Sequence, residues 1–362
     1  MEIPHNISLT PEIEGLVASG SPVAIGVSGG KDSQAAALAT FSYLDRAQHS
    51  GPRILIHADL GSVEWSDSLR ICKELATHFG RDLVVVRRKA GGLMERWKSR
   101  WLSSKTRYES LSTVTLVPCW STPAMRFCTS EQKTHVIMAD LKRRFKGQKI
   151  INVTGVRREE SAARSRMPPT STDTAGQIIT WRPIIDHTVD EVFGAIHDAG
   201  LLPHPAYREF GMSRVSCRFC IMSNLADLQA AALQPESQGL LQEMVDLEIE
   251  SSFAFQGSRW LGDIAPEKLS SSTRHRLKQA QERAIKRKSV EATLTKAMLF
   301  TKGWPERMLT DDEAALLCNA RNQISKMYGF ASDHLTVSGI QHRYAELLAE
   351  KSEKNPKQME FW

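Results

Sequence analysis

Residues 28–33 read Ser-Gly-Gly-Lys-Asp-Ser and directly follow an apolar run at 23–27. Two adjacent glycines let backbone N–H groups converge on an anion, because no Cβ obstructs their approach. The hydroxyls of Ser28 and Ser33 can donate to the same anion, and a helix starting here would direct its positive end toward it. The segment therefore predicts a phosphate-binding loop. The alternative is a tight strand-to-helix turn whose glycines serve packing alone.

This loop is not a Walker A motif. Only three residues separate Gly26 from Gly30, where a Walker A loop has four, and Asp32 stands where that motif has Ser or Thr. Lys31 and Asp32 are the candidate catalytic residues of the loop, because they offer a cation for phosphate and a carboxylate for Mg²⁺.

A second group of charged residues follows the apolar run 150–154. The segment begins at Gly155 and contains four arginines, Arg157, Arg158, Arg164 and Arg166. Arginine suits bidentate contacts to phosphate or sulfate. We interpret Arg157 and Arg158 as candidate catalytic residues, against the alternative of an ordinary charged surface.

The cysteines favour a metal or redox site over a disulfide framework. Six cysteines in 362 residues are too few for a disulfide scaffold. Cys217 and Cys220 have the Cys-x-x-Cys spacing of metal ligands, although this spacing alone fits zinc, an iron–sulfur cluster, a redox pair or coincidence.

Short apolar runs alternate with helical patterns over the first two-thirds of the chain. The runs are 23–27, 54–57, 83–86 and 150–154, and the helical stretches are 33–46, 64–79 and 131–145. This alternation predicts an α/β fold with a doubly wound, Rossmann-like parallel sheet that binds ligands at the carboxyl ends of its strands. Asp59 follows the second run and should lie at that edge. Residues 89–128 break the rhythm and suggest an insertion, and residues 168–180 suggest an exposed loop.

The pattern predicts two domains, 1–223 and 224–362. The second is helical and partly basic, with seven Lys or Arg and one Glu in residues 274–288. Such a helix could contact nucleic acid or could be a solvated surface helix.

Composition excludes several classes of protein. The chain is 41% hydrophobic with a net charge of +6, and it contains no apolar run of the roughly 18 residues that a membrane span needs. The first residues lack the charged and apolar regions of a signal peptide. We therefore expect a cytoplasmic protein without membrane contact.

Seven motifs in order resemble one family. They are residues 28–33, 57–61, 126–129, 155–161, 182–186, 205–207 and 217–220. Together they resemble the phosphoadenosine-phosphosulfate (PAPS) reductase family of the PP-loop ATP pyrophosphatase (adenine nucleotide alpha hydrolase-like) superfamily, over about residues 20–225. Members of this superfamily split ATP between its α and β phosphates and so activate an oxygen as an adenylate.

The resemblance implies roles for particular residues. The ATP phosphates would be held by Ser28, Gly29, Gly30, Lys31, Asp32, Ser33 and Gly155. Asp59 would lie near the nucleotide or its Mg²⁺, and Arg157 and Arg158 would contact phosphate or an anionic substrate. Cluster-bearing relatives imply a [4Fe–4S] cluster on Cys128, Cys217 and Cys220. Cys119 is the nearest candidate for a fourth ligand, and zinc or bare thiols remain alternatives.

One departure separates the chain from the reductases of that family. Those enzymes carry a nucleophilic cysteine in a short C-terminal tail, whereas this sequence has no cysteine after Cys318. With an intact phosphate loop, this difference favours an ATP-using sulfurtransferase that resembles DNA phosphorothioation enzymes of the Dnd and Ssp types. The expected partners are a cysteine desulfurase as sulfur donor and DNA or another nucleic acid, and a homodimer stays open.

Three alternatives to this function remain. They are a reductase of adenylylsulfate or phosphoadenylylsulfate, a tRNA thiolase, and a nucleic-acid-binding subunit that senses ATP without turnover.

Overall fold

The computed structural model describes residues 7–354 and divides the chain into two compact units. The first unit contains Met1–Met94 and Ser121–Leu240, and the second contains Glu95–Trp120 and Leu241–Trp362. The units differ from the predicted domains 1–223 and 224–362 in two ways. The first unit continues to Leu240, and the insertion suspected at 89–128 contributes residues 95–120 to the second unit.

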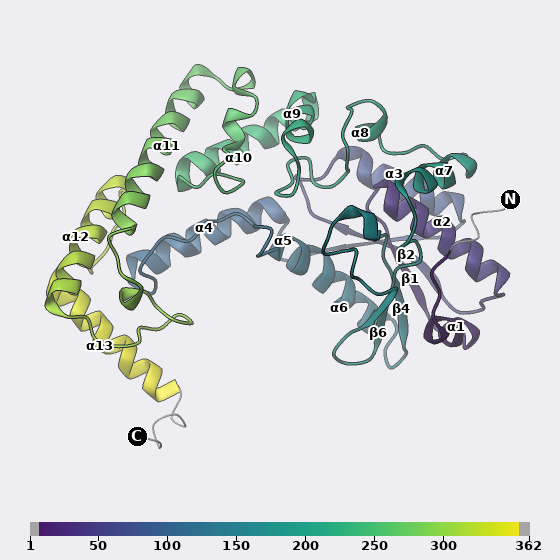
Figure 1. Ribbon diagram of the computed structural model, residues 1–362, viewed down its shortest axis with the longest axis horizontal. Coiled ribbons are helices and arrows are strands. Elements are labelled where there is room, and N and C mark those ends of the chain that lie inside the picture. The colour runs from purple at the N-terminus through teal and green to yellow at the C-terminus, as the bar shows by residue number, and fades with distance from the viewer. Residues whose placement is uncertain (1–6, 355–362) are drawn as a thin grey trace. The chain divides into compact units, whose positions relative to one another are not determined.

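A mostly parallel sheet forms the centre of the first unit (Figure 1). Its strands are β1 (Val23–Gly26), β2 (Arg53–Asp59), β3 (Leu83–Arg87), β4 (Ile150–Val153), β5 (Thr170–Thr172) and β6 (Ile178–Trp181). Their order is β3-β2-β1-β4-β6-β5, with only β5 antiparallel to its neighbour. The predicted α/β class and parallel sheet are confirmed.

The expectation of an exposed loop at 168–180 is only partly met, because residues 174–176 form an exposed turn between two strands that the sequence did not predict. This segment forms β5 and the start of β6, and β6 pairs in parallel with β4. Ile178 and Ile179 are fully buried, although they are too short an apolar run to signal a strand in the sequence.

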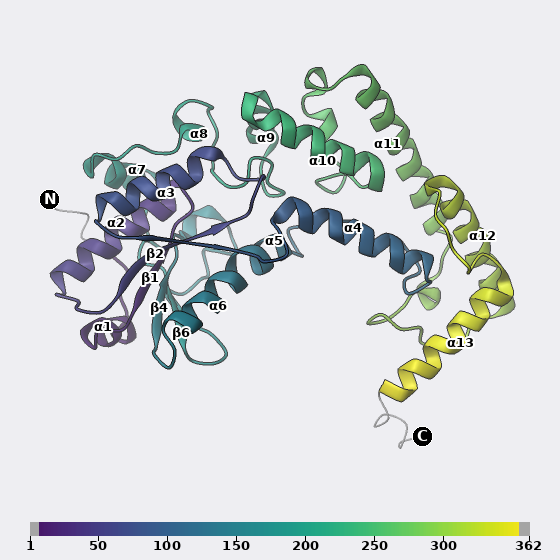
Figure 2. The same ribbon diagram turned by 180° about the vertical axis from the view of Figure 1, so that it is seen from behind.

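Alternation along the strands divides the core into two layers. Val23 and Ile25 pack with α1 (Pro11–Ala18), α2 (Lys31–Arg46), α3 (Ser66–His78) and α7 (Val189–Asp198). Ala24 and Ile56 point to the opposite face and pack with α6 (His135–Arg144). Helices therefore cover both faces of the sheet, as Figures 1 and 2 show. The carboxyl ends of the parallel strands remain the common edge at which loops can build a site.

Four short elements also belong to the first unit, and the first of them carries the predicted ligand Cys128. They are α5 (Phe127–Thr129), a π-helical turn (Ser130–Thr134), α8 (Pro205–Arg208) and α9 (Leu225–Leu233). The helix predicted at 131–145 thus begins with a π-helical turn before α6. Such turns often occur at functional sites.

The second unit is helical and is built on an aromatic core. Its helices are α4 (Leu93–Glu109, from residue 95), α10 (Gln238–Ser251, from residue 241), α11 (Ser271–Glu291), α12 (Asp311–Tyr328) and α13 (Val337–Lys354). Trp97 and Trp120 pack edge to face with ring centroids 5.2 Å apart, and Phe255 packs on both rings. The predicted helical character of the C-terminal region is confirmed.

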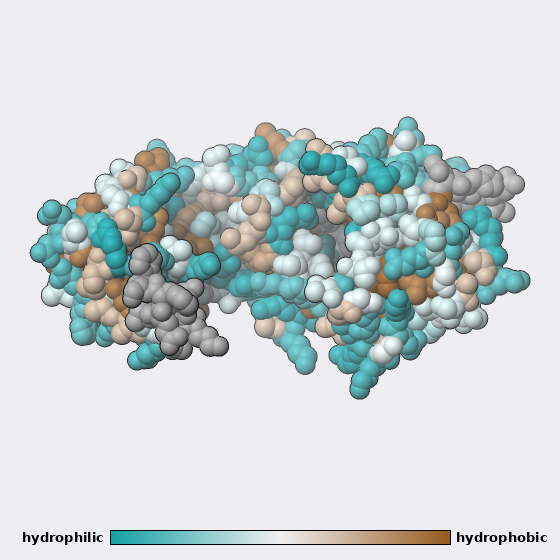
Figure 3. Space-filling model, turned by 60° about the horizontal axis from the view of Figure 1, so that its bottom comes forward, coloured by the Kyte–Doolittle hydropathy of each residue, from teal (hydrophilic) through white to brown (hydrophobic). Residues whose placement is uncertain are grey.

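Hydrophilic residues cover most of the face drawn in Figure 3, with small apolar areas between them. Between residues 7 and 354, no helix combines the length and the apolar character that crossing a bilayer requires.

Candidate active site

The loop between β1 and α2 has the shape of an anion cradle. Gly29 has φ +75°, and a Cβ at this position would lie 2.8 Å from the backbone of Ser68, so only glycine fits. Gly30 is extended and caps α2 without using a side chain, so the first N–H groups of the helix are not covered by a capping side chain. The sequence therefore folds here as strand, loop and helix, with the positive end of α2 at the loop.

Two serines fix the interior of this loop. Ser33 donates its hydroxyl to the carbonyl oxygen of Gly30 at 2.8 Å, and its Oγ accepts from the N–H of Ser28 at 3.2 Å. The Ser28 hydroxyl lies 3.4 Å from Ser33 Oγ. Both hydroxyls thus point inward, where they can reorient toward a bound phosphate.

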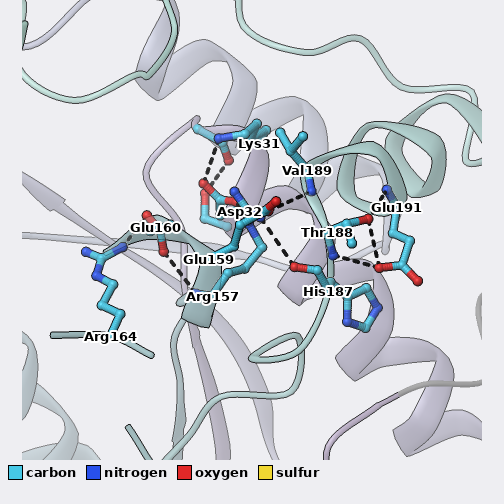
Figure 4. Close-up of polar contacts among 12 residues, drawn as sticks. Lys31, Asp32, Arg157, Glu159, Glu160, Arg164, His187, Thr188, Val189 and Glu191 are labelled. Atoms are coloured by element: carbon cyan, nitrogen blue, oxygen red, sulfur yellow. Dashed lines mark hydrogen bonds and ion pairs between the residues drawn. The ribbon is translucent and has the colours of Figure 1, made fainter. Parts of the chain in front are cut away.

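Asp32 links the loop to the segment that follows β4 (Figure 4). Its Oδ2 lies 3.1 Å from Lys31 Nζ, and its Oδ1 accepts from Arg157 Nε at 2.6 Å. Gly155 permits this approach, because a Cβ there would lie 2.3 Å from the Asp32 carbonyl oxygen. The predicted residues Lys31, Asp32, Gly155 and Arg157 therefore lie together.

Arg157 is held by protein groups from several sides. Its Nη1 donates to the His187 carbonyl oxygen at 3.3 Å and to the carboxylate of Glu159. Burial opposes its charge, but the hydrogen bond and negative charge of Asp32 raise the pKa of Arg157. With only 4% of its surface exposed, Arg157 acts on Asp32 rather than facing open space.

Two other predicted residues stand apart from the loop. Arg158 pairs with Asp186 and donates to the Met167 carbonyl oxygen at 3.3 Å. Asp59 accepts from the N–H of Gly61 at 2.7 Å. Neither Arg158 nor Asp59 lines the cavities described next, so direct contact with the nucleotide stays a prediction for both.

A cavity of about 290 Å³ opens beside the phosphate loop. The loop contributes Ser28, Gly30, Asp32 and Ser33 to its wall. Four cations complete the wall, namely Arg126, Lys133, Arg164 and Arg214. These cations neutralise part of the charge that a polyphosphate would bring into this space.

The sequence did not single out these four cations as site residues. Arg126 stands inside one of the motifs that carried the family resemblance, Arg164 lies three residues beyond another, and Arg214 lies three residues before Cys217. Lys133 had no comparable signal, because its position depends on the π-helical turn.

A second, more apolar cavity of about 260 Å³ adjoins the first. The two cavities share Gly26, Ser28, Lys133 and Thr154. His57 lies on the wall of the second cavity, with its Nε2 3.2 Å from a carboxylate oxygen of Glu64. Burial favours neutral His57, but hydrogen bonds with Cys72 and Glu64 and the Glu64 charge raise its pKa to about 10.

Three of the four predicted metal ligands line the first cavity. They are Cys128, Cys217 and Cys220, and all three are partly exposed. Loss of water around Cys217 raises the pKa of its thiol, and the positive charge of Lys133 opposes this effect. The donor chemistry suits iron or zinc. No group of three ligand-type residues within 7–354 is already gathered closely enough to hold a metal ion.

Cys119 does not line this cavity. It belongs to the second unit, where it is fully buried with its Sγ 3.9 Å from Ser251 Oγ. Burial raises the pKa of its thiol to about 12. The expectation that Cys119 supplies a fourth ligand gains no support from this position.

Arg218 fixes the turn between Cys217 and Cys220. Its N–H donates to the Val63 carbonyl oxygen at 2.9 Å. Its guanidinium donates to the carbonyl oxygens of Ser62 and Glu236. The cysteine turn is thereby attached to the loop that follows β2.

Comparison with known proteins gives one partial relative. An uncharacterized 37.8 kDa protein encoded in the gpa 5′ region of Escherichia phage 186 is 32% identical over 110 residues. The matched part covers 28% of this chain and only 32% of the phage protein.

Two solved structures are similar to parts of the chain at 15% identity. A PAPS reductase from Candida auris in its phosphate complex covers 59% of this chain and 97% of its own, with a TM-score of 0.36. A U34-tRNA thiolase from Methanococcus maripaludis, solved with its [4Fe-4S] cluster, covers 71% of this chain and 87% of its own, with a TM-score of 0.34. Similarity this distant carries no inference about function.

The family assignment depends on a longer match. The model of the phosphoadenosine phosphosulfate reductase domain matches residues 22–223, which is more than half of the chain and contains the phosphate loop, both cavities and the three thiols. The protein therefore belongs to the phosphoadenosine phosphosulfate reductase domain family.

Proposed function

We propose that this protein is an ATP pyrophosphatase that adenylylates an acceptor oxygen and then exchanges that oxygen for sulfur, with a DNA backbone phosphate as the acceptor. The observation that carries the proposal is that the phosphate loop and three cysteines line one cavity. A nucleotide phosphate and a sulfur atom can therefore meet without a large movement of the protein.

The two adjoining cavities suit the two ends of ATP. The apolar cavity offers Ile56, Ile137 and Met138 to a purine ring. The polar cavity offers loop N–H groups and cations to the phosphates. Because the cavities share Ser28 and Lys133, one nucleotide can extend from one to the other.

In the first step the acceptor oxygen attacks the α-phosphorus of ATP. A new P–O bond forms, the bond between the α-phosphorus and the bridging oxygen breaks, and pyrophosphate leaves with the electron pair. Arg126, Lys133 and Arg164 would neutralise charge as it moves onto the leaving group. Asp32 and Ser33 offer the hard oxygen donors that Mg²⁺ prefers. An acceptor phosphate is already anionic, so no general base is required.

In the second step sulfide attacks the activated phosphorus of the acceptor. A P–S bond forms and AMP leaves with the former acceptor oxygen, so no net oxidation or reduction occurs. A cysteine desulfurase is the expected class of sulfur source. It delivers persulfide sulfur, so a thiol reductant must supply two electrons to release the sulfide that attacks in this step. Cys128, Cys217 and Cys220 would hold an iron–sulfur cluster, whose chemistry is to bind sulfide at iron.

The test of nucleotide chemistry compares two Asp-to-Asn variants. Purified protein with Mg²⁺, labelled ATP and duplex DNA should produce AMP and pyrophosphate, measured by ion-exchange chromatography. Asp32→Asn keeps a hydrogen-bond acceptor for Arg157 but removes the charge, and it should slow turnover on the order of 100-fold. Asp82→Asn is the matched control, because Asp82 is exposed and remote from the loop in the sequence. ADP and free phosphate as the main products would refute the proposed cleavage.

A reductase is the second candidate, and family membership favours it. A cavity that takes the phosphates of ATP beside three thiols also suits an adenylylated sulfate. Sulfite produced from adenylylsulfate with a thiol donor, without ATP cleavage, would establish the reductase and exclude the sulfurtransferase.

A further inference from the structure

The basic side chains of helix α11 do not all face solvent. Arg287 is 1% exposed, lies 3.6 Å from the centroid of the Phe253 ring and donates to Tyr328 at 3.2 Å. Arg283 donates to the Ile249 carbonyl oxygen at 2.9 Å. These two arginines make their contacts within the second unit. They are therefore unsuited to the nucleic-acid contact that the sequence suggested for residues 274–288.

The outward face of α11 borders a hollow against α12. Lys286, Ser289 and Val290 lie three and four residues apart and therefore share one side of the helix. Gln323, Lys326 and Met327 have the same spacing on α12 and line the other side. The hollow has a volume of about 460 Å³, and α11 and α12 lie side by side in Figures 1 and 2.

A second hollow of about 630 Å³ continues along α12. It shares Gln323 and Lys326 with the first and adds Asn322, Ser325 and Phe330. We call the two hollows together the α11–α12 groove. No Asp or Glu lines either part of it.

Some cations of the second unit are neutralised by ion pairs, and the lysines of the groove are among those that are not. Arg276 pairs with Asp246, and Arg307 with Glu313. Lys286 and Lys326 form no ion pair among residues 7–354, and both are exposed. Two unneutralised ammonium groups thus border a groove that also offers amide, hydroxyl and aromatic groups.

We propose that the α11–α12 groove binds the phosphodiester backbone of DNA. This proposal rests on the proposed function, in which DNA is the acceptor. It identifies a surface outside the reaction cavity that would hold the DNA. Lys286 and Lys326 attract phosphates, and the side-chain amide of Gln323 between them offers a hydrogen-bond donor. Such contacts bind the backbone with little dependence on base sequence.

The test uses fluorescence anisotropy of a labelled DNA duplex at several salt concentrations. The double variant Lys286→Ala/Lys326→Ala should weaken binding on the order of 10-fold or more at low salt. It should also reduce the slope of log affinity against log salt by about two, because two phosphate contacts are lost. Lys268→Ala/Lys278→Ala is the matched control, with the same charge change at exposed, unpaired lysines of the same unit. The control should retain the wild-type slope.

Unchanged affinity and slope in the groove variant would overturn the proposal, as would equal loss in both double variants. If neither double variant binds DNA more weakly than the wild type, and an acidic peptide binds the wild type but not Lys286→Ala/Lys326→Ala, the groove binds a protein partner instead. Thermal unfolding of each variant identifies a folding defect, and a charge-preserving Lys286→Arg/Lys326→Arg variant should then restore DNA binding. Conversion of ATP to AMP with water as the acceptor, in the absence of DNA, measures the nucleotide chemistry separately, so failure of the groove and failure of the chemistry are distinguishable.

Discussion

Asp32 and Arg157 join the predicted phosphate loop to the segment after β4 through one part-buried ion pair. The sequence predicted Arg157 as a direct contact to phosphate, yet its Nε lies 2.6 Å from Asp32 and its guanidinium is enclosed by further acceptors. Removing either partner leaves the other charge without compensation and destabilises this part-buried pair. Arg157 is therefore best understood as the residue that orients Asp32. Of the cations that line the cavity, Arg164 is paired with Glu160.

The positions of the cysteines make separate predictions for iron binding. Cys128→Ser, Cys217→Ser and Cys220→Ser should each lose most of the iron, measured by colorimetric assay and visible absorbance after anaerobic purification. Cys119→Ser should retain it, because Cys119 is buried beside Ser251 in the second unit. Stoichiometric zinc in the wild type would replace the cluster by a zinc site, and iron loss in Cys119→Ser would restore the predicted fourth ligand.

Arg218 should control how readily the cysteine turn opens. In Arg218→Ala the turn loses hydrogen bonds to Ser62 and Glu236, and each such bond to a charged group contributes about 1.5–3 kcal/mol. Alkylation of Cys217 and Cys220 should accelerate by roughly 10-fold, measured by peptide mass spectrometry with Cys318 as an internal reference. Arg208→Ala also removes a guanidinium–carbonyl bond, to Pro203 at 2.8 Å, and serves as the control. Equal rates in both variants would show that Arg218 does not hold the turn.

At the scale of elements, local signals predicted the strand, glycine loop and helix around Gly29 and Gly30, because all their determinants are neighbours in the chain. Non-local features escaped prediction. Strands β5 and β6 gain their burial from pairing next to β4, and the cavity cations come from separate segments. The phosphate loop and the cysteines could thus be found in the sequence, whereas the cationic wall could not.

His204 joins α8 to α3 and makes the junction sensitive to acid. Its Nδ1 accepts from the Ala206 N–H at 3.0 Å, and its Nε2 lies 3.4 Å from Ser68 Oγ, in the residue that packs on Gly29. Burial lowers the pKa of His204 to about 4. Below pH 6.5 the unfolded state binds a proton that the folded state excludes, so stability falls between about pH 6.5 and 4.

The lowered pKa of His204 should reduce the free energy of unfolding by about 2 kcal/mol between pH 7 and pH 5. His204→Asn retains an acceptor for Ala206 but has no titrating group, so its free energy of unfolding should fall less over this range. Denaturant titrations at both pH values compare the two proteins. The same pH dependence in wild type and variant would exclude His204 as a source of acid sensitivity.

At the scale of the whole molecule, the two compact units cannot be separated by one cut in the sequence, because the second unit is built from two segments. Residues 95–120 belong to the second unit although they precede most of the first in the sequence. They contribute Trp97, Trp101 and Trp120, each at most 3% exposed. The sequence could not predict this membership, because it depends on packing with residues beyond 240.

The solubility of a chain truncated after the first unit should therefore depend on whether residues 95–120 are retained. A chain ending at Leu240 should aggregate, because three large rings lose partners from the second unit. Replacing residues 95–120 by a short Gly/Ser linker in the same truncation should restore a soluble first unit, measured by size-exclusion chromatography and nucleotide binding. A soluble, monomeric chain 1–240 with its insertion intact would contradict the division described above.

The π-helical turn Ser130–Thr134 also has a consequence for sequence length. A π turn contains one residue more than the α-helix it interrupts, and each residue of an α-helix turns the chain by about 100°. Deleting one residue here would let the helix close up and would rotate Cys128 away from the cavity while α6 stayed packed on the sheet. The register of this turn is thus a length constraint, and homologous chains that use the Cys128 thiol should not carry single-residue gaps within 130–134.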